Sequence, residues 1–99
     1  MSLVNEVCRL VPIETRIKGP HRDRVRFTDC EIDPAGQWAT LYVDINRYPA
    51  GIVGLELGQR DVLRYETFVE DHPRLSDQTK HTLIELGMRF LIKKTGAHF

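Results

Sequence analysis

The chain lacks an excess of charge of either sign, because its 99 residues include 14 Lys plus Arg and 14 Asp plus Glu. A dedicated nucleic-acid-binding protein usually carries a basic excess that neutralises phosphates. The balance therefore argues against that class, although it allows a local basic patch. A net charge of zero also provides little repulsion between copies near neutral pH, which favours self-association.

Long apolar runs and closely spaced cysteines are also missing. No segment approaches the length of a transmembrane helix, and the first residues lack the basic start of a signal peptide. We therefore expect a soluble, cytoplasmic protein that does not bind a membrane. The two cysteines, Cys8 and Cys30, form no CxxC or other recognisable pattern, so we expect both to be reduced thiols that fill space.

Motifs for metal binding, phosphate binding and nucleophilic catalysis are missing as well. The four histidines lack the spacing of a zinc site, and no glycine cluster matches a phosphate-binding loop. We therefore expect no metal and no cofactor, and the sequence disfavours an enzyme. A small enzyme with a site at a subunit interface, formed by His21 or His72 with Asp29 in a polar cleft, stays an alternative.

What is present is a β-hairpin signal around residues 33–37. Apolar residues occupy odd positions on both sides of this segment, at Val25, Phe27, Leu41, Val43 and Ile45. Because apolar residues that share a face pair across the strands, the pattern predicts Phe27 opposite Val43 and Val25 opposite Ile45. The loop then has three residues, 34–36, with a proline that begins a type I turn and a glycine in the left-handed region.

The same register pairs Arg26 with Asp44 and Ile32 with Trp38. It also places Asp29 on the apolar face, which is unfavourable for a carboxylate. A bulge near residue 28 or 29 would remove this conflict.

The remaining segments predict a small sheet and one long helix. Residues 7–18 alternate like a strand, although the first ten residues could instead begin a short helix, and residues 52–57 are a further strand. Residues 62–70 could be strand or helix, and their β-branched and aromatic residues favour strand. From Ser76 or Asp77 to Lys94 the pattern is helical. We expect one domain over residues 1–99, with an α+β fold: an antiparallel meander sheet of four to five strands and a C-terminal helix packed on one face.

The apolar surface exceeds what one copy is expected to bury. Phe90 and Ile92 widen the apolar side of the helix beyond the usual stripe. On the second face of the hairpin, Ile32, Trp38 and Tyr42 would form an exposed patch of the composition seen at interface centres. We therefore expect a small non-enzymatic protein-interaction module that acts as a homo-oligomer, such as a homodimer, and uses these five residues to bind another protein.

A basic segment provides the alternative function. Lys18, Arg22, Arg24 and Arg26 follow one another closely, and the last two share a strand face with Tyr42. Arginines at alternate strand positions beside an aromatic ring suit a phosphate or a stacked base. The alternative is therefore a nucleic-acid or phosphorylated-ligand binding protein. It is less favoured because neighbouring aspartates neutralise part of the charge.

Overall fold

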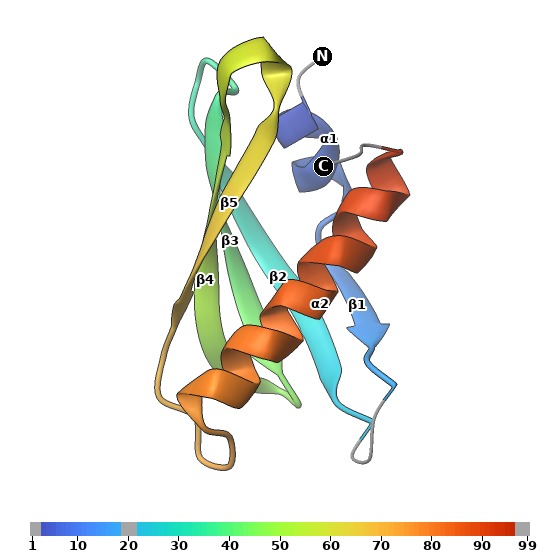
Figure 1. The fold of residues 1–99 in the computed structure, drawn as a ribbon, viewed down its shortest axis with the longest axis vertical. Helices are drawn as coiled ribbons and strands as arrows, with labels where there is room; N and C mark the ends of the chain where they lie inside the picture. Colours follow the sequence, from blue (N-terminus) through green and yellow to red (C-terminus); the bar gives the residue numbers. More distant parts are fainter. Residues whose placement is uncertain (1–2, 19–21, 97–99) are drawn as a thin grey trace.

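The computed structural model describes residues 3–18 and 22–96, which form five strands, two α-helices and a short 3-10 helix. In chain order the elements are α1 (Leu3–Leu10), β1 (Ile13–Arg16), β2 (Arg24–Ile32), β3 (Trp38–Ile45), β4 (Tyr48–Leu57), a short 3-10 helix η1 (Gln59–Asp61), β5 (Leu63–Val69) and α2 (Asp77–Thr95). The strands form one antiparallel meander in the order β1-β2-β3-β4-β5. The predicted α+β fold, with a C-terminal helix packed on the sheet, is confirmed (Figure 1).

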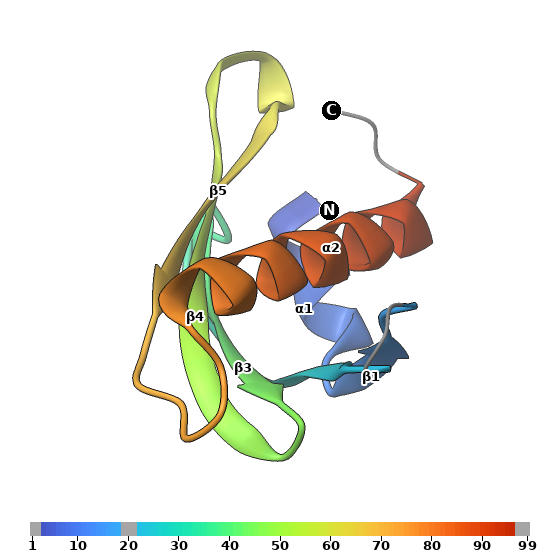
Figure 2. The ribbon, with the colours of Figure 1, turned by 60° about the horizontal axis from the view of Figure 1, so that its bottom comes forward.

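Both helices lie on the same face of the sheet, which we call the inner face (Figures 1 and 2). Helix α2 begins where the sequence predicts, because the Ser76 hydroxyl accepts a hydrogen bond from the Thr79 N–H at 3.2 Å. It ends at Gly96, whose φ of 78° is the left-handed conformation typical of a helix C-terminus. No helix among the described residues is long and apolar enough to cross a membrane.

The core lies between the inner face and the two helices. It contains Val4 and Val7 of α1, Val25 and Phe27 of β2, Leu41, Val43 and Ile45 of β3, Val53 and Leu55 of β4, and Ile84, Met88, Leu91 and Ile92 of α2. Helix α2 approaches β2 closely at Gly87, where a Cβ would stand 2.8 Å from Val25 Cγ1. This glycine therefore sets the distance between the helix and the sheet.

One charged side chain is buried at the start of α2. Lys80 is 1% exposed, pairs with Asp77 at 2.8 Å and donates to the carbonyl oxygen of Glu70. These contacts connect the first turn of the helix to the segment that follows β5. They also satisfy an ammonium group that would otherwise be costly to bury.

The β2–β3 hairpin has the predicted register at its base and a different one at its tip. Phe27 pairs with Val43, Val25 with Ile45 and Arg26 with Asp44, as predicted. The register then shifts between Phe27 and Asp29, so the predicted bulge is confirmed.

Beyond the bulge, the earlier expectations are wrong by one residue. Ile32 pairs with Ala39 and not with Trp38. The loop has four residues rather than three, because the Asp33 N–H donates to the Trp38 carbonyl at 3.1 Å. The turn itself is as expected: the Gly36 N–H donates to the Asp33 carbonyl at 2.9 Å, and Gly36 has a φ of 71°.

The Asp33 carboxylate holds the hairpin loop together. It accepts hydrogen bonds from the backbone N–H groups of Trp38 at 2.8 Å, Gln37 at 2.6 Å and Ala35 at 3.2 Å. These bonds stabilise the ionised form, with that of Trp38 the largest cause, and lower the pKa of Asp33 below its usual 3.8.

The structure distinguishes helix from strand in the two segments where the sequence allowed both. Residues 3–10 are helical and the strand begins only at Ile13, so the strand interpretation of residues 7–12 is wrong and the helical alternative is confirmed. Residues 63–69 form strand β5, as the β-branched and aromatic composition favoured.

The expectation of two reduced thiols is wrong, because Cys8 of α1 and Cys30 of β2 form a disulfide with a Cα–Cα distance of 5.6 Å. The hairpin bulge is the physical reason. A shift of one residue moves Cys30 from the outer to the inner face, where α1 lies.

Candidate functional site: the outer face of the sheet

The face of the sheet opposite the helices, the outer face, has no second layer over it among the described residues (Figure 2). The alternation of buried and exposed positions and the strand register identify its members. They are Glu14, Arg16, Arg24, Arg26, Asp29, Glu31, Trp38, Thr40, Tyr42, Asp44, Ile52, Gly54, Glu56, Arg64, Glu66 and Phe68. Trp38 is 53% exposed and Phe68 is 50% exposed.

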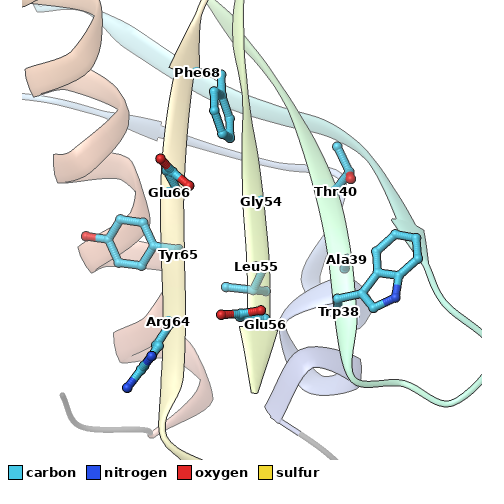
Figure 3. A pocket seen from close by; sticks show the side chains of 10 residues that line it. All are labelled: Trp38, Ala39, Thr40, Gly54, Leu55, Glu56, Arg64, Tyr65, Glu66 and Phe68. Atoms are coloured by element: carbon cyan, nitrogen blue, oxygen red, sulfur yellow. The ribbon is translucent and has the colours of Figure 1, made fainter. Parts of the chain in front are cut away.

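A hollow of about 480 Å³ lies over β3, β4 and β5 on this face. Its floor is at Gly54, whose missing side chain leaves the backbone open between Trp38 and Phe68 (Figure 3). The register explains this geometry, because Gly54 pairs with Thr40 on one side and with Glu66 on the other. Trp38 lies two residues from Thr40, and Phe68 lies two residues from Glu66 toward the other end of the sheet. The ring of Phe68 leans over the glycine, with Cε2 3.8 Å from the position that a Cβ would take.

The hollow carries more negative than positive charge. Glu56 and Glu66 line it, and neither forms an ion pair or a side-chain hydrogen bond among the described residues. Arg64 also lines it, but its side chain lies against Gly58, with Nε 3.1 Å from the position of a Cβ there. Two carboxylates beside exposed aromatic rings are an arrangement that attracts a cation.

Tyr42 lies next to further acidic groups on the outer face. A hydrogen bond to Glu31 raises the pKa of Tyr42, and burial and the nearby charge of Asp29 act in the same direction. The bulge is responsible for this neighbourhood, because it pairs Asp29 with Tyr42 and Glu31 with Thr40. Tyr42 therefore lies in negative surroundings, which do not suit a phosphate.

Basic side chains gather at the other end of β2. Arg16 of β1 pairs directly with Arg24 of β2, and Arg26 follows between Glu14 and Asp44. Lys18 and Arg22 are exposed in the adjoining loop. Among the described residues, none of these five bases forms an ion pair.

The structure brings two of the five predicted interface residues together on the outer face, Trp38 and Tyr42. Ile32 lies on the inner-face side at the end of β2, beside Cys8 and Arg9 of α1. Phe90 is half-buried on α2 and contacts Lys94, whose Nζ is 5.4 Å from the ring centre. Ile92 is 2% exposed and part of the core, so this helix end is covered within the same chain, which also packs α1 against α2.

Sequence reasoning missed three neighbours of Trp38 and Tyr42 on the outer face, namely Ile52, Gly54 and Phe68. The alternation along β4 and β5 could have identified two of them. Ile52 directly precedes the buried Val53, and Phe68 directly precedes the inner-facing Val69, so both side chains point to the outer face. Without the order of strands, nothing in the sequence indicates that β3, β4 and β5 bring them into one row.

The histidines proposed for an enzyme do not gather at Asp29. His21 lies outside the described residues. The His72 Nε2–H donates to the Ile45 carbonyl at 3.0 Å, its Nδ1 accepts from the Arg74 N–H at 3.1 Å, and its ring contacts that of Tyr48 edge-on. His72 therefore has a structural role in the loop before α2.

A separate polar cluster connects β5 to α2. The Tyr65 hydroxyl donates to Glu85 Oε2 at 2.6 Å, and the Thr67 hydroxyl and His81 Nε2 lie 3.5 and 3.6 Å from Glu85 Oε1. Burial, followed by the contact with Glu85, raises the pKa of Tyr65 to about 12. The arrangement keeps the phenol protonated and fastens the edge strand to the helix.

Comparison with known proteins gives no further guidance, because no family model, no curated protein and no solved structure matches the chain significantly. Within the described residues, no three His, Cys, Asp or Glu side chains are grouped so that they could hold a metal ion.

Proposed function

We propose that the protein is a non-enzymatic protein-interaction module that binds its partner through the outer face of the sheet. The observation that supports this most is the exposure of about half of Trp38 and Phe68 on a face that no described element covers. Aromatic residues are enriched at protein interfaces, and Trp and Tyr contribute a large share of the binding energy.

The shape of the site favours a protein over a small molecule. A small-molecule site is usually a deep and mostly apolar cavity that surrounds its ligand. Here the floor of the hollow is the partly exposed backbone at Gly54, and its walls are side chains that stand on a sheet surface (Figure 3). A broad surface of this kind suits a partner that covers it with several side chains.

Site-specific photo-crosslinking tests the proposal. A photoreactive benzoylphenylalanine replaces Phe68 on the outer face, and as a control it replaces Thr82, which is exposed on α2. After irradiation in cells that naturally make the protein, we expect a covalent adduct with a protein from position 68 and none from position 82. Irradiation that yields no adduct at position 68, or equal adducts at both positions, would contradict the proposal.

The second candidate is a ligand with phosphate groups that binds the basic segment. It is supported by Arg24 and Arg26, which share the outer face with Arg16. Tyr42 does not join them, because acidic groups surround it. If this candidate is correct, fluorescence anisotropy with a labelled oligonucleotide will show binding that weakens steeply with added salt, and Arg24→Gln with Arg26→Gln will abolish it.

A further inference from the structure

We propose that the partner on the outer face is a second copy of this chain, docked face to face, with the arginines of one copy against the carboxylates of the other. The inference rests on the proposed use of the outer face and names its occupant. It is carried by the distribution of charge on this face, by an unfavourable pair of arginines and by the size of the face.

The balance of charge differs between the two ends of the outer face. At the end that carries Trp38, three carboxylates outnumber one base: Glu31, Glu56 and Glu66 against Arg64. At the other end, three bases outnumber two carboxylates: Arg16, Arg24 and Arg26 against Glu14 and Asp44. Along β3, Thr40, which adjoins Glu31, is separated from Asp44, which adjoins Arg26, by roughly 13 Å at the usual rise of a strand. The whole chain has a formal net charge of zero, so the separation leaves two complementary ends on one molecule.

The basic end is unfavourable in an isolated copy. Arg16 and Arg24 stand directly opposite each other on neighbouring strands, and like charges in this arrangement destabilise a sheet. Among the described residues, no carboxylate forms an ion pair with either. An anionic surface laid over this pair would remove the repulsion.

The acidic end has the complementary chemistry. The hollow offers two carboxylates, Glu56 beside the exposed ring of Trp38 and Glu66 beside that of Phe68 (Figure 3). A guanidinium can pair with a carboxylate and stack on an aromatic ring at the same time. Arginine is therefore the side chain that this hollow fits best, and the outer face of a second copy supplies it.

A two-fold axis brings these ends together. If the axis lies in the plane of contact and crosses the strands obliquely, it exchanges the β1–β2 corner of the face with the β4–β5 corner. The arginines of each copy then lie over Glu56 and Glu66 of the other. Such an interface is isologous and closes after two copies. Tyr42, Ile52 and Phe68, which pair across the middle of the face, then lie near the axis, with Asp29 in the same row on β2.

The outer face is large enough for this contact. The molecule measures 38 Å by 23 Å by 21 Å. One broad side of it, about 38 Å by 23 Å, is of the order of the roughly 800 Å² that each partner buries in a stable dimer, so a contact over the five strands can reach that size.

Charge reversal with complementation tests the inference. One variant carries Arg16→Glu and Arg24→Glu, and the other carries Glu56→Arg and Glu66→Arg. We expect sedimentation velocity to show a dimer for the unaltered chain at micromolar concentration. Each variant alone should dimerise at least about tenfold more weakly, and an equimolar mixture should form a heterodimer of near-original affinity. Circular dichroism of each variant checks that these surface changes leave the fold intact.

An unaltered chain that stays monomeric at these concentrations would overturn the inference, as would a mixture that fails to associate. The proposed function is tested separately, because an adduct of a different protein at position 68 would support it even when the chain is monomeric. An adduct at twice the mass of the chain supports both.

Discussion

At the scale of single residues, the contact between Tyr65 and Glu85 makes stability depend on alkaline pH. An unfolded tyrosine titrates near pH 10, whereas the pKa of Tyr65 in the folded chain is about 12. The folded state therefore retains a proton that the unfolded state releases. The stability that this group contributes is fully present below pH 10 and is lost as the pH rises from 10 to 12.

Tyr65→Phe removes this group, and we expect the free energy of unfolding to depend less on pH between 10 and 12. Urea denaturation at pH 9 and at pH 11 measures the difference. Tyr48→Phe, at an exposed position, is the matched control and should behave like the unaltered chain. If Tyr65→Phe keeps the full alkaline loss of stability, groups other than Tyr65 cause it.

Two glycines provide a test of close packing at single positions. At Gly87 a Cβ would stand 2.8 Å from Val25 Cγ1, so Gly87→Ala forces the helix away from the sheet. We expect a loss of about 1–3 kcal/mol from overpacking, partly offset by about 1 kcal/mol from the higher helix propensity of alanine. The nearest atom at Gly54 is 3.8 Å away, so Gly54→Ala should be neutral or stabilise the strand by about 0.5–1 kcal/mol.

Urea denaturation of both glycine variants provides the measurement. A Gly87→Ala chain as stable as the Gly54→Ala chain would show that α2 can move without cost. Gly54→Ala also fills part of the hollow without disturbing the fold, so it can be used to test whether the hollow takes part in binding.

At the scale of elements, the disulfide holds α1 on the sheet. It connects residues 22 apart, and a loop of this length corresponds to roughly 3 kcal/mol of stabilisation. We expect Cys8→Ser with Cys30→Ser to lower the free energy of unfolding by about this amount. Dithiothreitol should lower the melting temperature of the unaltered chain and leave that of the double variant unchanged. Equal melting temperatures with and without dithiothreitol would mean that the disulfide contributes little.

The disulfide also bears on where the protein matures. Disulfides form and persist mainly in oxidising compartments and are rare in a reducing cytoplasm. The cytoplasmic location expected from the sequence therefore stays a prediction, and the link between Cys8 and Cys30 weighs against it.

The β2–β3 hairpin shows which features of an element the sequence can predict. Alternating apolar residues predict the pairing of Phe27 with Val43, and the proline and glycine of the loop predict its turn, because both signals are local. The position of Asp29 even indicates a bulge. However, the sequence does not determine which residue is the extra one. A shift of one residue moves every later side chain of the strand to the other face of the sheet.

The positions of the residues beyond the bulge depend on this change of face. With the bulge, Cys30 turns to the inner face and reaches Cys8, while Asp29 and Glu31 turn outward to Tyr42. The disulfide, the acidic surroundings of Tyr42 and the inward position of Ile32 therefore could not be derived from alternation alone. The cover of Ile92 by the same chain also depends on long-range packing, since α1 is only eight residues long and has little stability by itself.

At the scale of the whole molecule, equal numbers of acidic and basic residues allow a chain with no net charge to associate through charge. Because the arginines and carboxylates involved stay near the surface, salt should screen their attraction over about 10 Å at 0.1 M and about 3 Å at 1 M. We therefore expect the dimer to dissociate roughly tenfold more readily in 1 M than in 0.1 M sodium chloride, as measured by sedimentation velocity.

Variants of the exposed aromatic residues separate charge from apolar contact in the same experiment. Trp38→Ala and Phe68→Ala remove buried apolar area but no charge, so they should weaken the dimer at both salt concentrations and leave the ratio between them unchanged. The chain with Arg16→Glu and Arg24→Glu should instead reverse the salt dependence, because its new carboxylates face the carboxylates of the other copy and sodium chloride screens their repulsion. If association of the unaltered chain strengthens with sodium chloride, apolar contact alone joins the copies, and the opposed ends of the outer face have no part in it.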